Sequence, residues 1–230
     1  MRTLGLIGGM SWESTLPYYR LVNERVRERL DGLHSAKLLL YSVDFAEVEA
    51  MQRAGDWMGA AAFMVDAAKR LQRGGAEAIV ICTNTMHRLA PDIESAVDLP
   101  LLHIADVAAD AIAAAGLSRI ALLGTRFTME QPFYRERLAA RGLDVRVPDE
   151  AGRADIHRII YDELCRGDIR DESRERYREV IASLVDGGAE GIVLGCTEIG
   201  LLVGPGDAAV PMFDTTALHA RAAADWSIDA

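Results

Sequence analysis

Cysteine is scarce in this sequence: among 230 residues only Cys82, Cys165 and Cys196 carry a thiol. The three form no CxxC pair and show no Cys/His ligand spacing. Neither a disulfide framework nor a cysteine-based zinc site is therefore indicated. Reduced thiols point to a cytoplasmic protein, and we expect no structural metal.

Long apolar runs are also missing. No stretch approaches the roughly 18 uninterrupted apolar residues that a membrane span needs. The N-terminal MRTLGLIGGMSWES has one arginine and a short apolar run before two glycines. That pattern is typical of a first strand and not of a secretion signal. We expect no membrane partner.

An excess of basic residues is absent as well. The chain has 25 Lys and Arg against 35 Asp and Glu, a net charge of −10, with the two signs interspersed. This balance argues against a nucleic-acid partner. A chain of this length can bury a large core, and its 50% hydrophobic content is ordinary for a soluble globular protein.

What the sequence does contain is an internal repeat. GGAEAIVICTNT at residues 74–85 returns as GGAEGIVLGCTE at 187–198, an offset of 187 − 74 = 113 residues. LGLIGGM at 4–10 resembles IALLGTR at 120–126, and LPLLHIAD at 99–106 resembles VPMFDTTA at 210–217. Three blocks in the same order indicate an ancient duplication with small insertions.

Short apolar runs alternate with amphipathic segments along the whole chain. Strands are expected at 3–8, 37–44, 78–83, 101–104, 119–124, 144–147, 191–196 and 212–213, and helices at 13–29, 57–72, 87–96, 106–115, 130–140, 154–166, 172–186 and 216–224. The apolar runs are mostly non-alternating, as in parallel strands covered on both faces. With the repeat, they predict an α/β fold of two pseudo-symmetric, doubly wound domains.

Ligands of such folds bind beyond the carboxyl ends of the strands, and the candidate functional residues all lie at those ends. The repeat superposes Thr83 on Cys196, so one position carries a hydroxyl and its twin a thiol. Two opposed groups flanking one substrate suit proton transfer on either face of a carbon atom. We therefore expect an active site in the cleft between the two domains.

Cys196 ends a strand before an expected helix N-terminus, where the helix dipole and backbone N–H groups favour a thiolate. The alternative is a buried structural cysteine. Thr83 is a poor base near pH 7, and it also suits an N-cap or a carboxylate-binding hydroxyl. Cys82 points to the opposite face of its strand from Thr83, which predicts that Cys82 packs in the core.

Polar residues follow both positions. Asn84 and Thr85, like Thr197 and Glu198, suit carboxylate binding or helix capping. GTRFT at 124–128 supplies the hydroxyls of Thr125 and Thr128 for an anion or a cap. A nucleotide site at GLIGGM, with Asp44 on a ribose, is disfavoured because the spacing is not GxGxxG. His87, His103 and Asp214 are more typical of hydrogen-bonded structural residues.

GLIGGMSWEST, CTNTMH, LLGTRFTMEQPFY and GCTEIGLLV, in that order, closely resemble the aspartate/glutamate racemase family over essentially the whole chain. The similarity is strongest to its L-aspartate/glutamate-specific and broad-specificity branch. The resemblance implies a homodimeric racemase that uses neither pyridoxal phosphate nor another cofactor. It also implies a first domain of residues 1–98 plus 208–230 and a second of 99–207.

By the same resemblance, Cys196 is one catalytic residue, and Thr83 stands where a first cysteine usually precedes Asn-Thr. Asn84, Thr85 and Thr197 correspond to ligands of the substrate's α-carboxylate, and Met10 and Gln52 to cleft-lining residues. Some aspartate racemases carry a lysine near the position of Cys165, where it assists the side-chain carboxylate. In this chain Arg126 or Arg166 are candidates for that role.

The function expected from these residues is racemisation of aspartate, glutamate or a related polar amino acid. Cys196 would remove or return the α-proton on one face, and Thr83 would serve the other. Two alternatives remain open. One is decarboxylation of a malonate-type acid, which needs a single cysteine, and the other is a non-catalytic amino-acid-binding protein.

Overall fold

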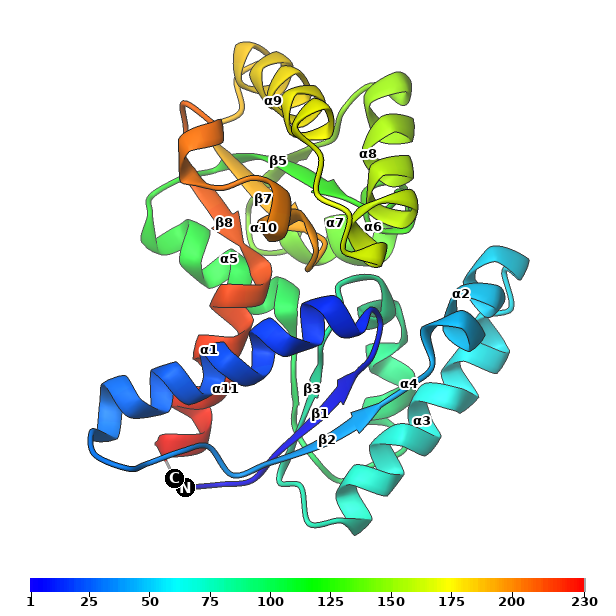
Figure 1. Cartoon of the computed structure of the whole chain (residues 1–230), viewed down its shortest axis with the longest axis vertical. Helices are drawn as coiled ribbons and strands as arrows, with labels where there is room; N and C mark the ends of the chain where they lie inside the picture. The colour runs from blue at the N-terminus through cyan, green and yellow to red at the C-terminus, as the bar shows by residue number, and fades with distance from the viewer. Residues whose placement is uncertain (230) are drawn as a thin grey trace. The chain divides into compact units, whose positions relative to one another are not determined.

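A computed structural model describes residues 1–229, which form two compact units (Figure 1). The first unit is Met1–His103 together with the residues from His219 onward, and the second is Ile104–Leu218. Each unit is built on its own four-stranded parallel sheet. The predicted fold class, with two related doubly wound α/β halves, is confirmed.

The sheet of the first unit has the strand order β2-β1-β3-β4. Its strands are β1 (Leu4–Gly8), β2 (Leu38–Ser42), β3 (Ala78–Ile81) and β4 (Leu101–Leu102). The helices are α1 (Trp12–Leu30), α2 (Phe45–Ala54), α3 (Trp57–Arg73), the 3-10 turn η1 (Thr85–Leu89), α4 (Ala90–Glu94) and, from His219 on, α11 (Thr215–Ile228). Both central strands, β1 and β3, are fully buried, as their apolar sequences require.

Helices cover both faces of this sheet (Figure 1). Ile79 of β3 packs in one apolar cluster with Met64 of α3. Val80, which points to the opposite face, packs in another with Tyr18 of α1 and Ala220 of α11. The alternation of side chains along a strand therefore produces a helix–sheet–helix layering.

The second unit repeats this arrangement with the order β6-β5-β7-β8. The strands are β5 (Arg119–Gly124), β6 (Asp144–Arg146), β7 (Gly191–Gly195) and β8 (Met212–Asp214). The helices are α5 (Ile104–Ala114), α6 (Arg126–Glu130), α7 (Pro132–Ala139), α8 (Glu150–Asp162), α9 (Asp171–Asp186) and α10 (Ile199–Leu202), with 3-10 turns η2 (Leu164–Arg166) and η3 (Pro205–Asp207). Ile192 and Val193 of β7 face opposite apolar clusters, as their counterparts do in the first unit.

The strand order and the register both preserve the repeat. The three repeated sequence blocks form β1 and β5, β3 and β7, and β4 and β8. Ile7 of β1 pairs with Ile81 of β3, and Leu123 of β5 pairs with Leu194 of β7. The hydrogen-bonded register of the strands in each half thus agrees with the alignment of the two halves in the sequence.

The domain boundaries differ from those expected, which were 1–98 plus 208–230 and 99–207. β4 pairs with β3 of the first sheet, and β8 pairs with β7 of the second. Each of these short strands satisfies its backbone groups on the sheet of its own half. Only the helix that follows β8 returns to the first unit, and the division falls inside α11, between Leu218 and His219.

Helical segments also differ from the expected ranges in several places. α2 was not expected, although Asp44 caps it by accepting a hydrogen bond from the Ala46 N–H at 3.0 Å and Gly55 ends it with φ +70°. The expected helix 87–96 is η1 followed by α4. The expected helix 130–140 begins earlier and breaks between α6 and α7, at Gln131. The Asp44 carboxylate therefore caps α2, which does not support the disfavoured nucleotide site in which Asp44 would bind a ribose.

Within residues 1–229 no helix combines the length and the apolar character needed to cross a membrane.

Candidate active site

Thr83 lies two residues beyond the end of β3 and is 9% exposed. Its backbone carbonyl accepts a hydrogen bond from Nδ1 of His87 at 2.7 Å. Its hydroxyl makes no hydrogen bond to any of the residues that the structure describes. No base of this unit therefore activates the hydroxyl, because the His87 imidazole is hydrogen-bonded to the backbone carbonyl of Thr83 and not to its side chain.

His87 belongs to a buried group of three imidazoles in the first unit. The ring centroids of His87 and His103 are 4.6 Å apart, and those of His87 and His219 are 5.7 Å apart. Burial, and then the charges of the other two rings, lower the pKa of His87 well below its usual value. His87 is therefore neutral near pH 7, and Nδ1 carries the proton that it donates to Thr83.

His219 connects this group of imidazoles to α1 and β4 through two hydrogen bonds. Its Nδ1 lies 2.9 Å from the Tyr18 hydroxyl, and its Nε2 lies 2.7 Å from the Leu102 carbonyl oxygen. Since a carbonyl only accepts, Nε2 bears the proton and Tyr18 donates to Nδ1. Burial lowers the pKa of His219 to about 4. His87, His103 and His219 have the structural role that was expected of two of them.

Asn84 and Thr85 follow Thr83 at the start of η1 and are almost fully buried. Met10 and Gln52 are buried in the same unit. Met10 and Met86 belong to one apolar cluster, and Gln52 Nε2 lies 3.1 Å from Met86 Sδ. Five of the predicted site residues thus lie in this unit, with Met10 and Gln52 joined through Met86.

The turn after β1 depends on glycine. Gly9 has φ +89°, and a side chain there would collide with the Val43 backbone. The Gly9 N–H is bound by the Thr15 hydroxyl at 2.9 Å, which anchors the start of α1 to this turn. The GLIGGM sequence therefore shapes a tight strand–helix connection and delivers Met10 to the carboxyl edge of the sheet.

Cys196 occupies the equivalent place in the second unit, two residues after Leu194, and is 7% exposed. Its Sγ donates a hydrogen bond to Glu198 Oε2 at 3.1 Å. The Thr197 hydroxyl donates to the same oxygen at 2.8 Å. A thiol and a hydroxyl therefore share one buried carboxylate oxygen.

The expectation that a helix N-terminus favours a Cys196 thiolate stays a prediction: the Glu198 backbone N–H lowers the pKa of this thiol, but larger effects oppose it. Burial, the Glu198 charge and the Cys165 thiol raise the pKa of Cys196 well above its usual value. The helix that follows, α10, has only four residues, so it contributes a small dipole. Together these effects disfavour the thiolate of Cys196 in this structure.

Thr125 and Thr128 form a cap at the end of β5. The Thr125 hydroxyl accepts a hydrogen bond from the Thr128 N–H at 3.3 Å, and the two hydroxyls are 3.3 Å apart. Thr128 also packs on the last glycines of β5 and β7. A Cβ on Gly195 would come within 2.7 Å of Leu122 Cδ1, and one on Gly124 within 2.7 Å of the Gly195 oxygen. These contacts fix the backbone from which Cys196 projects.

The other two cysteines differ from each other in how deeply they are buried. Cys82 is fully buried in the cluster between β3 and α1, which confirms its predicted core position, and burial raises the pKa of its thiol. Cys165 lies in η2 and packs against the cluster that contains Cys196. Burial raises the pKa of Cys165 too.

Tyr177 of α9 was missed from the sequence. It is fully buried in the cluster that contains Cys196, and its hydroxyl has no hydrogen-bond partner among residues 1–229. Burial and the charges of Cys196, Cys165, Glu163 and Glu198 raise its pKa. A tyrosine in an amphipathic helix carries no local signal for such a position, because only the tertiary packing brings it to the thiol.

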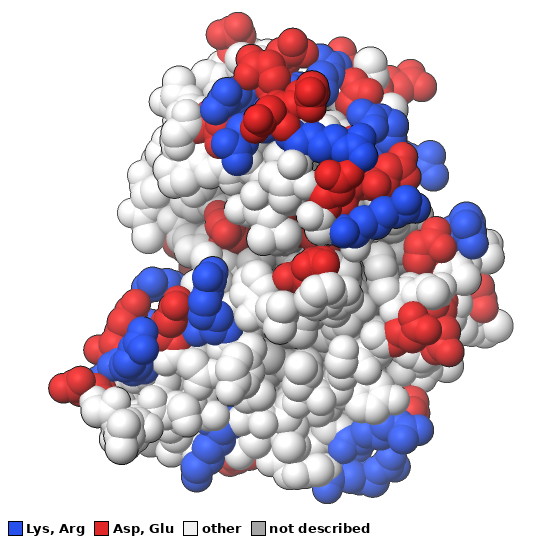
Figure 2. Space-filling model, in the orientation of Figure 1, with Lys and Arg blue, Asp and Glu red and all other residues white. Residues whose placement is uncertain are grey.

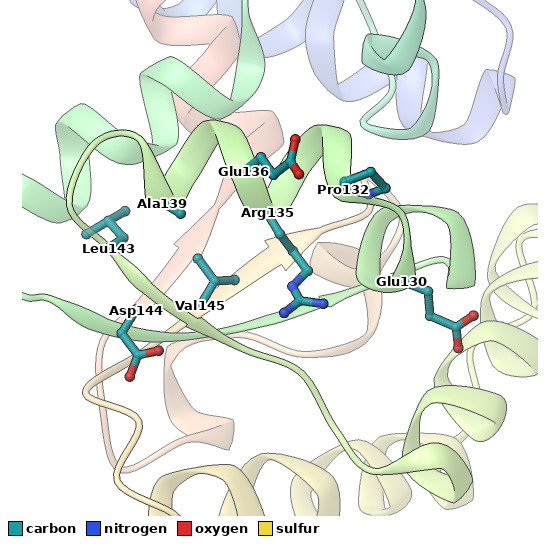
Figure 3. A pocket seen from close by; sticks show the side chains of 8 residues that line it. All are labelled: Glu130, Pro132, Arg135, Glu136, Ala139, Leu143, Asp144 and Val145. Carbon is teal, nitrogen blue, oxygen red and sulfur yellow. The ribbon is translucent and has the colours of Figure 1, made fainter.

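A surface hollow of about 420 Å³ lies over β6 and α7 of the second unit (Figure 3). Arg135 points into it, with Glu136 and Asp144 at its rim. None of its lining residues is one of the predicted site residues. The hollow is therefore not part of the candidate active site.

Comparison with known proteins agrees with this fold. A family model described as Asp/Glu/hydantoin racemase matches residues 7–223. The crystal structure of a proposed Asp/Glu racemase from Yersinia pestis is 58% identical, covers 99% of this chain and 100% of that one, and superposes with a TM-score of 0.92. An aspartate racemase homologue from Pyrococcus horikoshii is 35% identical at the same coverages, with a TM-score of 0.85. A broad-specificity amino-acid racemase from Bacillus subtilis is 21% identical over 225 residues, 95% of each chain.

Proposed function

Because the chain belongs to the Asp/Glu/hydantoin racemase family, we propose that it interconverts the L and D forms of aspartate, glutamate or a related polar amino acid. The observation that carries the proposal is the equivalence of Thr83 and Cys196 in two sheets of the same register. A repeated fold with one proton-bearing side chain at the same position of each half suits a reaction in which two groups act on opposite faces of Cα.

In the proposed reaction Cys196, as thiolate, removes the α-proton of one enantiomer and becomes a thiol. The resulting carbanion accepts a proton on the other face from Thr83, directly or through a water molecule. The reverse direction uses the same groups in the opposite sense. Thr83 is the weaker partner, because its hydroxyl has no activating base within its own unit.

The remaining predicted residues are assigned to substrate binding. Asn84, Thr85 and Thr197 supply neutral hydrogen-bond donors for the α-carboxylate. Thr125 and Thr128 hold the edge of the second sheet, and Met10 and Gln52 line the binding site. A cofactor has no part in the proposal, and the protein is proposed to act in the cytoplasm.

The deciding experiment is α-proton exchange in D2O with separate L and D forms of aspartate and glutamate, without added cofactor. Loss of the α-proton signal is followed together with optical configuration. Exchange with inversion, abolished by Cys196→Ala, supports the racemase. Cys82→Ala is the matched control, because that thiol is buried in the core and should leave exchange unchanged.

Other outcomes of the same experiment identify the alternatives. A decarboxylase changes the mass of its substrate, whereas a racemase leaves it unchanged. Binding of aspartate without exchange of its α-proton identifies a binding protein. Either result contradicts the proposed function.

We also propose that the protein is a homodimer that uses the outer face of α1 and β2. Trp12, Leu16 and Tyr19 recur at helical spacing along α1 and are each more than half exposed. Leu40 of β2 is 45% exposed and lies beside Thr15 of the same helix. Figure 2 shows a broad area without charged side chains over this unit. An exposed apolar area of this kind is typical of a protein–protein interface.

A further inference from the structure

The backbone carbonyl of Thr83 accepts a hydrogen bond from the imidazole of His87, four residues further along the chain, at 2.7 Å. The preceding residue, Cys82, is still joined to the first strand, because its N–H donates to the Ile7 oxygen at 2.9 Å. Thr83 lies beyond this ladder. Within residues 1–229 the bond from His87 is the only hydrogen bond that Thr83 makes. The imidazole therefore fixes the backbone of the residue whose hydroxyl is proposed to react.

The equivalent carbonyl of the second unit is held in a different way. The Cys196 carbonyl accepts a hydrogen bond from the backbone N–H of Ile199 at 3.2 Å. At the 113-residue offset of the repeat, His87 corresponds to Gly200, which has no side chain that could donate a hydrogen bond. The half that carries the thiol thus holds this carbonyl with a backbone turn, whereas the half that carries the hydroxyl holds it with an imidazole.

His87 is itself held in place within the first unit. Its side chain is buried, and its ring centroid lies 4.6 Å from that of His103 and 5.7 Å from that of His219. His219 is in turn hydrogen-bonded to the Tyr18 hydroxyl and to the Leu102 carbonyl. A donor that is packed and braced in this way keeps the carbonyl that it binds in one position.

A hydroxyl is a weak acid and a weak base, so proton transfer through Thr83 depends strongly on its geometry. A displacement of about 1 Å can cost about 10²-fold in rate. We propose that His87 is the positioning residue for Thr83: its hydrogen bond fixes the backbone from which the hydroxyl projects, so that His87 controls proton transfer on the Thr83 face of Cα and not on the Cys196 face. This inference rests on the proposed racemase function and deepens it.

Two amide substitutions at position 87 separate the hydrogen bond from the packing of the ring. In His87→Asn the amide nitrogen takes the place of Nδ1 and can donate to the same carbonyl. In His87→Gln the amide nitrogen takes the place of Nε2, and the bond to Thr83 is lost. Both variants lose the ring packing on His103, so a difference between them reports on the bond alone. His87→Leu, which also lacks a donor, replaces His87→Gln if that protein does not fold.

The measurement follows α-proton exchange and inversion together in D2O, starting from the aspartate enantiomer that exchanges faster. Exchange with retention needs Cys196 alone, whereas inversion also needs Thr83. In His87→Gln, inversion is expected to fall about 10-fold or more, while exchange with retention and KM stay unchanged. His87→Asn is expected to keep most of the native inversion rate. Adding His87→Gln to a Thr83→Ala protein is expected to cause no further loss of exchange.

Tyr18→Phe is the control for a general loosening of the imidazole group. It removes the hydrogen bond to His219 and leaves the bond between His87 and Thr83 in place. Its ratio of exchange to inversion is therefore expected to stay at the native value, even though the protein is less stable.

A His87→Gln protein in which exchange and inversion fall in the same proportion overturns the inference, because that result shows a merely structural role. Equal rates of inversion in His87→Asn and His87→Gln overturn it too. The native protein separates these failures from that of the function. If it racemises and either result is found, only the role of His87 is refuted. If it exchanges no α-proton with any of the four amino acids, the proposed function itself is refuted.

Discussion

Thr83 and Cys196 stand at the same position of two equivalent sheets. Each lies two residues beyond a residue of the third strand that pairs with the first strand just before a glycine, Ile81 with Ile7 and Leu194 with Leu123. The hydroxyl of one half thus replaces the thiol of the other in an otherwise conserved backbone frame.

Restoring a thiol at the first position tests what this replacement does. In Thr83→Cys, we expect the slower direction of racemisation to gain about 10²-fold in kcat, because a thiol is a far better acid and base than a hydroxyl. The measurement is the initial rate of inversion from each enantiomer separately. Thr83→Ser keeps a hydroxyl and should show no gain. An unchanged slower direction in Thr83→Cys counts against Thr83 as the limiting group.

Removing the Tyr177 hydroxyl is expected to stabilise the protein. A buried hydroxyl without a partner costs about 1–3 kcal/mol, so Tyr177→Phe should raise the free energy of unfolding by about 1 kcal/mol. Urea denaturation provides the measurement. Tyr18→Phe is the matched control with the opposite sign, since the Tyr18 hydroxyl binds His219. A loss of stability in Tyr177→Phe would mean that the hydroxyl has a partner in solution, such as a bound water.

His219 makes stability depend on pH. Burial lowers its folded pKa to about 4, against about 6.5 in an unfolded chain. Between these values the unfolded chain binds more protons, so stability decreases as pH falls from about 6.5 towards 4. From this residue alone, the free energy of unfolding is about 3 kcal/mol higher at neutral pH than at a pH below both pKa values.

His219→Gln is expected to make the free energy of unfolding depend less steeply on pH. It is also expected to lower stability at pH 7, because the hydrogen bonds of His219 are lost. His87, whose pKa is also lowered, keeps part of the slope. Urea denaturation at several pH values between 7 and 4.5 measures the pH dependence of the free energy of unfolding separately from its value at pH 7. Parallel curves for the native protein and the variant would show that His219 does not titrate in this range.

A charge in the apolar face of α1 and β2 tests the homodimer. Leu16→Glu is expected to convert dimers to monomers while the circular dichroism spectrum stays unchanged. Sedimentation over a range of concentrations measures the change. Leu33→Glu is the control, because Leu33 is fully exposed outside this face and should leave the dimer intact. A native protein that sediments as a monomer refutes the proposed interface.

The repeat and the apolar strand patterns predicted most of the fold, because both report on backbone frames that a duplication preserves. The short edge strands were assigned to the wrong halves: β4 and β8 have too few residues to reveal which sheet they extend. α2 was not predicted, although Asp44 and Gly55 are ordinary capping residues.

The candidate site was predicted less completely. Position and residue type, as at Thr83 and Cys196, follow from local sequence and the repeat. The direction in which the pKa of Cys196 shifts does not, because it depends on burial, on the Glu198 side chain folding back and on Cys165 arriving from η2.

The crowding at the end of β5 and β7 has a consequence for the range of chemistries that this scaffold can acquire. Gly124 and Gly195 have no room for a side chain, because Thr128 and the neighbouring strand occupy it. The residue after Gly195 is Cys196, where a substitution changes the reacting atom and leaves these glycine contacts in place. A laboratory search for new activities in this protein should hold those glycines constant and randomise positions 83, 196 and 198 together.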